Sequence, residues 1–329
     1  MDEQEPILNE ENRRFTLYPI KYTDIWNLYQ QQLAAFWKPN EIDFSRDLDD
    51  FLVMNENEQF YIKRILAFFA ASDGLVNFNI GKRFLNDIKI MEGLVCYTYQ
   101  MMMEYQHSES YSIMLDNLVK NTEGKNYLLN SIETVDSVRE IANWALKWSN
   151  SEKSFAHRVI AFACMEGILF SGAFASIFWV KAHASRGRLF LQGLVKSNEF
   201  IARDEKMHTE FGVLLYNKLE KTRLPQNEVW EIIDESVLVA KNFMTDALPV
   251  RLLGMSNESM SDYLEYVGDS LLVDLKYQKK YNKKNPFLFM ETIGLSGKTN
   301  FFESRPSEYT GVYAMGRINT DLKLFEDDF

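Results

Sequence analysis

The chain of 329 residues is poor in the residues that build loop-rich or cross-linked folds. It contains only two cysteines, seven prolines and fifteen glycines. Two cysteines cannot form a disulfide framework, and both Cys96 and Cys164 lie in strongly apolar stretches. We therefore expect buried, reduced thiols and a cytoplasmic location. No run of alternating polar and apolar residues indicates strands, and helical periodicity dominates, so the predicted class is all-α.

The chain also lacks an excess of basic residues. Lysine and arginine number 36 against 47 aspartates and glutamates, which gives a formal net charge of −11. A protein that grips phosphates usually shows the opposite sign or a clear basic patch, so we expect no direct nucleic-acid partner. No phosphate-binding glycine loop is present. The acidic N-terminus, MDEQEP, resembles neither a secretory signal nor a transit segment.

One segment is long and apolar enough to cross a membrane. Residues 159–180 (VIAFACMEGILFSGAFASIFWV) contain a single charge, Glu166. Neighbouring segments are amphipathic, and no second segment of this kind exists in the sequence. We therefore interpret it as a central helix that other helices surround, and we expect no membrane partner.

Long helices with short connections are typical of a bundle. We predict breaks near Pro39, Gly124, Gly187 and Pro225. The predicted helices cover about 23–36, 56–84, 91–119, 132–149, 154–184, 192–220, 227–245 and 260–276.

Three regions are expected along the chain. Residues 1–20 form an N-terminal arm, 21–285 a helical domain, and 286–329 a C-terminal extension. The chain ends in an acidic segment with spaced leucine and phenylalanine, NTDLKLFEDDF (319–329). From this spacing alone, a frayed terminus and a flexible segment that docks a partner are equally good interpretations.

Two of the four histidines lie in a Glu-x-x-His motif. These are Glu104–His107 and Glu205–His208, each within a predicted long helix. Residues three apart share a helix face, so each motif directs a carboxylate and an imidazole to the same place. A single motif of this kind is common on surfaces, whereas two in long helices indicate a shared site.

Two further carboxylates stand alone in apolar stretches. Asp73 lies in ILAFFAASDGLV (65–76), and Glu166 lies in the apolar central helix. A buried carboxylate is costly unless it is protonated, paired with a base or bound to a metal, and no base lies one turn away from either. With the two motifs they make four carboxylates and two imidazoles. The four negative charges of the carboxylates would balance the charges of two divalent cations. This set favours iron or manganese over zinc, and it is typical of ferritin-like di-metal carboxylate bundles with long helices around the metal pair.

A tyrosine follows only one of the motifs. Tyr111 is seven residues after Glu104, on the same face, whereas Gly212 holds the corresponding position in the second motif. Tyr111 is either a core tyrosine with a satisfied hydroxyl or a redox-active phenol beside one metal. Its expected apolar neighbours around the ligands are Phe170, Phe174 and Ile201.

The residues leave several functions open. One is an oxygen-activating di-metal enzyme, such as an oxidase or a fatty-acyl desaturase. A second is an iron-storage or ferroxidase bundle, which would normally be shorter and lack the extension at 286–329. A metal-free helical scaffold would not explain two lone buried carboxylates.

Six segments of the sequence match one known family. They are FWKPNEIDFSRD (36–47), MEYQHSESY (103–111), CMEGILFSGAF (164–174), FIARDEKMHTEF (200–211), LPVRLLGM (248–255) and NPFLFMETIGLSGKTNFFESR (285–305). In these segments the chain resembles the small subunit of class I ribonucleotide reductase, over roughly residues 36–329. The last two segments look particularly like eukaryotic and viral members.

The resemblance implies two irons per chain, oxo-bridged when oxidised, with manganese as an alternative. Asp73, Glu104 and His107 would bind one ion. Glu166, Glu205 and His208 would bind the other, and glutamates would bridge the pair.

The resemblance also implies a redox role for four residues. Tyr111 matches the tyrosine that carries the radical. Trp37 and Asp204 match the pair that, with His107, leads from the metal site to the surface. Tyr309 is the better match for the tail tyrosine that relays the radical, and Tyr313 is the alternative.

The implied enzyme is an oxidoreductase that provides a tyrosyl radical for the reduction of ribonucleoside diphosphates. The large subunit would hold the nucleotide and the reducing thiols, since this chain has no Cys-x-x-Cys pair. The resemblance further implies a homodimer, O2 and an external electron donor as reactants, a cytosolic location, and docking of the large subunit by the acidic tail.

Overall fold

The computed structural model describes residues 2–184, 190–248, 252 and 255–290. Within these ranges the chain is helical, and its only β-type pairing is an isolated bridge between Leu252 and Met255. Tyr309, Tyr313 and the acidic tail lie outside the described residues. The predicted all-α class is confirmed for the part of the chain that is described.

The helices follow one another with short connections. In chain order they are α1 (Thr23–Ala34), α2 (Asp47–Leu52), α3 (Glu56–Asn79), α4 (Leu85–Asp87), α5 (Met91–Leu118), α6 (Thr122–Leu129), α7 (Ser131–Thr134), α8 (Asp136–Ser149), α9 (Phe155–Cys164), α10 (Phe170–Trp179), α11 (Gln192–Asn217), α12 (Gln226–Ala247) and α13 (Asn257–Asp274). In the described part of the chain, three π-helical turns extend or join these helices: η4 (Ile80–Phe84), η5 (Met165–Leu169) and η6 (Val180–Ala184).

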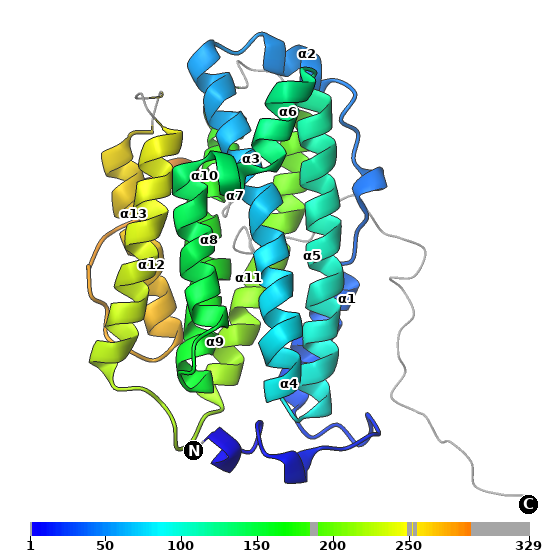
Figure 1. Cartoon of the computed structure of the whole chain (residues 1–329), viewed down its shortest axis with the longest axis vertical. Helices are drawn as coiled ribbons and strands as arrows, with labels where there is room; N and C mark the ends of the chain where they lie inside the picture. Colours follow the sequence, from blue (N-terminus) through cyan, green and yellow to red (C-terminus); the bar gives the residue numbers. More distant parts are fainter. Residues whose placement is uncertain (1, 185–189, 249–251, 253–254, 291–329) are drawn as a thin grey trace, which may run out of the picture.

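Four long helices form the centre of the bundle (Figure 1). α3 packs against α5, the continuous α9–η5–α10 helix packs against α11, and both pairs contact each other. α1 covers α5 and α11, α8 packs on α3 and α9, and α12 and α13 pack on the α9–η5–α10 helix. The predicted ferritin-like bundle is confirmed, and its axis is the place where side chains from all four central helices meet.

The apolar segment around Glu166 is buried inside the bundle. The helix from Phe155 to Ala182 is long and apolar enough to cross a membrane, but 89% of its most apolar 18-residue window is buried. The interpretation of a central helix surrounded by others is therefore confirmed. Cys96 and Cys164 are likewise buried and free, as predicted. Burial raises the pKa of the Cys164 thiol to about 12, which keeps it protonated.

Local interactions explain where the helices depart from prediction. The predicted helix 132–149 is interrupted at Val135, whose extended backbone (φ −126°) ends α7 and begins α8. The expected break near Gly124 lies inside α6, because the Asn121 side chain caps that helix by accepting from the Glu123 amide. α2 was not predicted, since its six residues are too few to show a period.

The helix that carries the second Glu-x-x-His motif is capped by acids from α2. Asp47 accepts hydrogen bonds from the amides of Gly193 (3.0 Å) and Leu194 (2.7 Å), and Asp50 accepts from the Leu191 amide (2.9 Å). Carboxylates stabilise a helix N-terminus because they satisfy its free amides and oppose its dipole. Burial raises the pKa of Asp47 to about 6. The cap fixes the start of α11, and with it the register of Glu205 and His208.

We expect Gly193→Ala to lower the free energy of unfolding by about 1–3 kcal/mol, because the added methyl group overpacks the cap. A Cβ at this position would lie 2.5 Å from Phe44 Cδ1 and 2.8 Å from both Asp43 O and Asp47 Oδ2. Urea unfolding measures the change.

The matched control is Gly124→Ala in α6, where the added Cβ would have Val119 Cγ1, at 3.6 Å, as its nearest neighbour outside the helix's own backbone. This change should raise the free energy of unfolding by up to about 1 kcal/mol, because alanine favours a helix more than glycine does. Equal stability of the two variants would contradict the proposed role of the cap.

Candidate metal centre

All six predicted metal ligands are buried in the middle of the bundle. None is more than 2% exposed. They come from each of the four central helices: Asp73 from α3, Glu104 and His107 from α5, Glu166 from the π-helical turn η5, and Glu205 and His208 from α11. A π-helical turn is rare and is frequently found at functional sites, which fits the position of Glu166.

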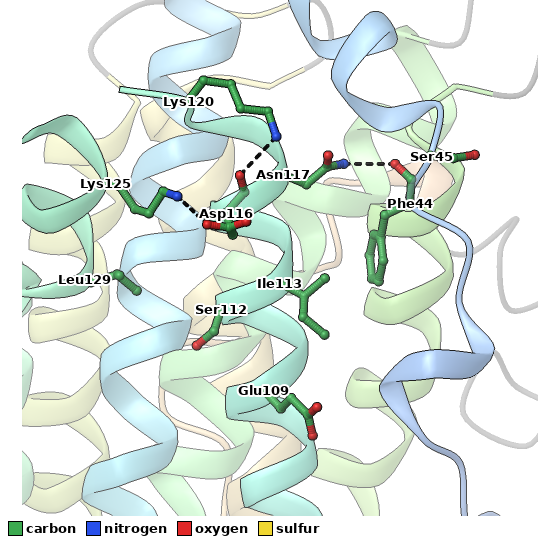
Figure 2. A pocket seen from close by; sticks show the side chains of 10 residues that line it. All are labelled: Phe44, Ser45, Glu109, Ser112, Ile113, Asp116, Asn117, Lys120, Lys125 and Leu129. Carbon is green, nitrogen blue, oxygen red and sulfur yellow. Dashed lines mark hydrogen bonds and ion pairs between the residues drawn. The ribbon is translucent and has the colours of Figure 1, made fainter. Parts of the chain in front are cut away.

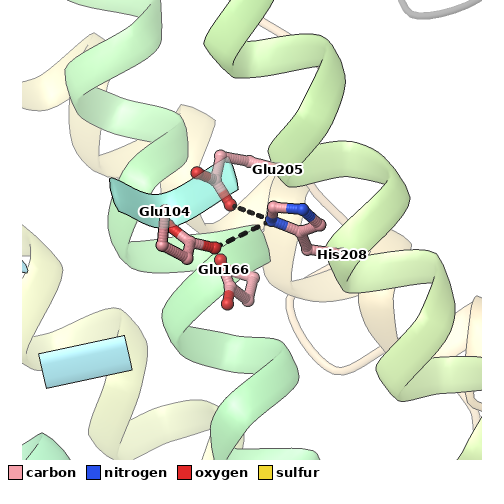
Figure 3. A group of neighbouring side chains, drawn as sticks. All are labelled: Glu104, Glu166, Glu205 and His208. Carbon is pink, nitrogen blue, oxygen red and sulfur yellow. Dashed lines mark hydrogen bonds and ion pairs between the residues drawn. The ribbon is translucent and has the colours of Figure 1, made fainter. Parts of the chain in front are cut away.

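Four of these side chains form a compact cluster (Figure 3). Ligand atoms of Glu104, Glu166, Glu205 and His208 all lie within 4.8 Å of one another. His208 Nδ1 is 2.9 Å from Glu104 Oε1 and 2.9 Å from Glu205 Oε2. Neighbouring ligands of one octahedral ion with bonds of 2.0–2.1 Å lie about 3 Å apart, so this spacing suits a shared cation.

Two of the glutamates lie between the two imidazoles. The second oxygen of Glu205, Oε1, is 2.8 Å from His107 Nδ1, and the second oxygen of Glu104, Oε2, is 3.4 Å from it. Each of these carboxylates therefore offers one oxygen to each histidine. This is the placement expected of a carboxylate that bridges two metal ions, one beside His107 and one beside His208.

Several of the buried polar atoms have no hydrogen-bond partner within the described residues. They are Asp73 Oδ2, Glu104 Oε2, His107 Nδ1 and Glu166 Oε2. Among the described residues His107 Nδ1 has no hydrogen-bond partner, although Glu205 Oε1 lies 2.8 Å away, within the distance of an ion pair. Unpartnered acceptors in a dry core are costly, and cations would satisfy them. The residues present therefore fit a pair of metal ions.

Burial and mutual repulsion shift the ionisation of the cluster. Burial raises the pKa of Asp73 and of Glu166 well above the ordinary range, and neighbouring carboxylates raise both further. Burial alone would lower the pKa of His208, but the charges of Glu205 and Glu104 raise it to about 9. The same balance raises the pKa of His107, through Asp204 and the two glutamates. Without metal, protonated imidazoles thus partly neutralise the acids.

The ring of Tyr111 lies in an apolar environment. It is 2% exposed, and it stacks on Phe69 with the centroids 4.5 Å apart and the planes at 1°. Phe170 and Phe174 contact Phe69 and form the next layer. The phenol oxygen has no hydrogen-bond partner within the described residues. Burial raises its pKa well above 10, and the charge of Asp73 adds to this, so the phenol remains protonated.

A chain of hydrogen bonds leads away from His107. Trp37 Nε1 donates to Asp204 Oδ2 (2.7 Å), and the same oxygen lies 3.2 Å from His107 Nε2. Arg203 holds the other oxygen, Oδ1, with Nη2 at 2.9 Å and Nε at 3.1 Å. Although burial raises the pKa of Asp204, Arg203 and His107 lower it below its ordinary value, so Asp204 is an anion. The structure thus brings Trp37, Asp204 and His107 together.

Sequence reasoning did not identify three residues beside the site. Phe69 covers Tyr111, Arg203 fixes Asp204, and Gln100 Nε2 donates to Glu166 Oε1 at 2.9 Å. Gln100 is fully buried one turn before Glu104 in an otherwise apolar part of α5. Its position in the sequence, a polar residue four before Glu104, could have identified Gln100 as a neighbour of the site. Nothing in the sequence pattern singled out Phe69.

Comparison with known proteins identifies the family. The family model described as "Ribonucleotide reductase, small chain" matches residues 14–286. The chain belongs to the ribonucleotide reductase small-chain family. The ribonucleoside-diphosphate reductase small chain of vaccinia virus (strain Western Reserve) is 45% identical over 324 residues, covering 98% of this chain and 99% of that protein. The small chain of Plasmodium falciparum (isolate Dd2) is 46% identical over 325 residues, covering 97% and 91%.

The fold comparison agrees with this assignment. The ribonucleotide reductase Rnr4 homodimer from Saccharomyces cerevisiae matches with a TM-score of 0.79 and 35% identity, covering 88% of this chain and 90% of that one. The predicted family, fold and enzyme class are confirmed. The chain is the small subunit of an oxidoreductase that acts with a large subunit, within a family of di-metal carboxylate enzymes.

We expect metal-free protein to lose stability as the pH rises from 6.5 to about 9. The pKa of His208 is about 9 in the folded chain against an ordinary value of 6.5. A group whose pKa is raised by folding stabilises the fold fully below its unfolded pKa, and this contribution disappears as the pH rises through its folded pKa. The Tm of metal-free protein should therefore fall by a few degrees across this range.

Two variants make this measurement specific. His208→Gln should weaken the pH dependence, although His107, whose pKa is also raised, still contributes to it. His157→Gln should leave the dependence unchanged, because His157 pairs with Glu228 away from the site. Metal-loaded protein should also depend less on pH, since the metal replaces the proton on the imidazole. A metal-free Tm that is constant or rising over this range would contradict the account.

Proposed function

We propose that this chain generates the tyrosyl radical that its large subunit uses to reduce ribonucleoside diphosphates to deoxyribonucleotides. The observation that carries the proposal is the position of Glu104 and Glu205, each with one oxygen near His107 and the other near His208. Two cations in a dry core are the arrangement that this geometry fits best.

Each metal ion would have its own set of ligands. Asp73 and His107 would bind the ion on the Tyr111 side, and Glu166 and His208 would bind the other. Glu104 and Glu205 would bridge the pair. We propose iron as the metal because oxygen ligands with one imidazole per ion suit it, and manganese fits the same ligands. When bound and reduced, the metal pair supplies the power to oxidise a phenol, using O2 and electrons from an external donor.

The chain's own residues place and protect the radical. Tyr111 would lose one electron and its phenolic proton. Phe69, stacked on its ring, would exclude water and other reductants, and the second layer of Phe170 and Phe174 would extend this apolar shield. Asp73 is the carboxylate whose charge acts most strongly on the phenol.

The chain Trp37–Asp204–His107 would couple electron transfer to proton transfer. Asp204 Oδ2 accepts from the Trp37 indole and faces His107 Nε2, so a proton can shift along the chain as an electron moves. Arg203 would keep Asp204 ionised and oriented. A storage bundle or an unrelated oxidase has no need of such a chain, and this favours the reductase.

The remaining assignments concern regions that the structure describes in part. We propose an arm at 1–20, a metal-binding domain at 21–285 and an extension at 286–329. The arm is attached to the bundle, since Glu5 accepts from the amides of Glu220, Lys221 and Thr222. The extension would carry Tyr309, or Tyr313, as the relay. Its acidic end would dock the large subunit, and the active unit would be a cytoplasmic homodimer.

Tyr111→Phe tests the radical assignment. The variant should bind about two irons per chain, because no ligand changes, but should give no tyrosyl signal after metal-free protein is mixed with ferrous iron and O2. Electron paramagnetic resonance with metal analysis on the same sample measures both. A variant that kept the wild-type tyrosyl signal would contradict the role of Tyr111.

Trp37→Phe tests the proposed chain Trp37–Asp204–His107 separately from radical formation. It removes the indole donor to Asp204 and leaves the metal ligands and Tyr111 unchanged. It should form the radical, yet lower nucleotide reduction with the large subunit by roughly 100-fold or more. Full reduction activity in Trp37→Phe would favour a different route for the radical.

A further inference from the structure

A cavity of about 630 Å³ lies beside the candidate metal centre, between α1, α10, α11 and α13. At its inner end it is lined by Glu166 and Glu205, which are each 2% exposed. Its lining also includes Asp24, Glu210 and Asp274, all of which are exposed at the surface. The cavity therefore runs from solvent to the position proposed for the second metal ion.

The lining of this cavity is strongly acidic. Within the described residues it contains five carboxylates and a single amine, that of Lys206. Lys206 Nζ lies 3.3 Å from Glu210 Oε1, and Asp24 pairs with Lys218, which is outside the lining. Partial desolvation on the cavity side and the charge of Glu210 raise the pKa of Asp274, which places these two acids close to each other at the outer end. Such a wall attracts cations and repels anions.

The inner end offers a free ligand atom. Glu166 Oε2 has no hydrogen-bond partner within the described residues, while Glu166 Oε1 is held by Gln100 at 2.9 Å. A buried carboxyl oxygen without a hydrogen-bond partner, on a residue that lines an acidic cavity, can bind an arriving cation. This observation is independent of the acids at the surface, and it shows that the inner end of the cavity holds an acceptor for a cation.

We propose that this cavity is the route by which divalent metal ions reach the buried centre, with Glu210 and Asp274 as their first acceptors and Glu166 as the inner one. The proposal rests on the proposed function, since it requires the ions to be bound inside. A hydrated divalent ion would exchange waters for carboxylate oxygens in steps along the wall, so that it is never fully desolvated without ligands.

A second cavity of about 640 Å³ provides a comparison (Figure 2). It lies along α5 and α6, and none of the six predicted ligands lines it. Its acids, Glu109 and Asp116, are balanced by Lys120 and Lys125, and Lys125 forms an ion pair with Asp116. It therefore has neither the excess negative charge nor the inner acceptor of the first cavity.

The test follows the uptake of Co²⁺ by metal-free, full-length protein. Stopped-flow absorbance of the bound ion gives the rate, and titration gives the final stoichiometry. Glu210→Gln combined with Asp274→Asn should slow uptake roughly tenfold at low ionic strength, because two charges that attract the ion are lost. The difference should shrink as salt is added, and the final stoichiometry should remain about two ions per chain.

The matched control combines Glu109→Gln with Asp116→Asn in the second cavity. It removes the same formal charge as the first double variant, and it does so in a cavity of similar volume. It should change the rate of Co²⁺ uptake by less than about twofold. Should the first double variant fold poorly by circular dichroism, Glu210→Gln alone should slow uptake about threefold.

Equal uptake rates in the two double variants would overturn the proposal. So would a fall in stoichiometry at an unchanged rate, since Glu210 and Asp274 would then hold metal instead of guiding it. A wild-type chain that binds fewer than two Co²⁺ at equilibrium would contradict the proposed function itself, which separates the two failures.

Discussion

Four carboxylates share one dry helical core, and the rest of the structure depends on how their charges are neutralised. Asp73, Glu104, Glu166 and Glu205 are each no more than 2% exposed. Like charges at this depth repel strongly and have little water to screen them. In the metal-free chain, protonated imidazoles and raised carboxyl pKa values relieve the repulsion only partly, as the unpartnered oxygens show. Two divalent cations would remove it, so folding and metal binding are linked.

This constraint also explains why α11 is anchored so firmly. α11 carries Asp204, Glu205 and His208, and thus contributes to the metal pair and to the chain toward Trp37. The acids of α2 cap its first turn, and Arg203 fixes Asp204 close to the midpoint of the helix. A shift of α11 along its axis would disturb both functions at once. The cap and Arg203 thus fix α11 at its first turn and near its midpoint, where the ligand positions matter most.

The sequence was sufficient to predict the residues whose chemistry is unusual for their surroundings. The two Glu-x-x-His motifs and the lone acids Asp73 and Glu166 were identified from spacing and apolar context. The long helices were predicted because a 3.6-residue period persists over many turns. The six residues of α2 and the break at Val135 were not, because short elements depend on caps and on tertiary contacts. Phe69 and the acidic cavity arise from packing between distant helices, which no local pattern reveals.

The most direct test of the metal centre is anomalous diffraction at the iron edge from crystals of iron-loaded protein. We expect two peaks per chain, one next to His107 and Asp73 and the other next to His208 and Glu166. Both peaks should lie between the carboxylates of Glu104 and Glu205. A single peak, or peaks away from these six side chains, would contradict the assignment of this core as a di-metal site.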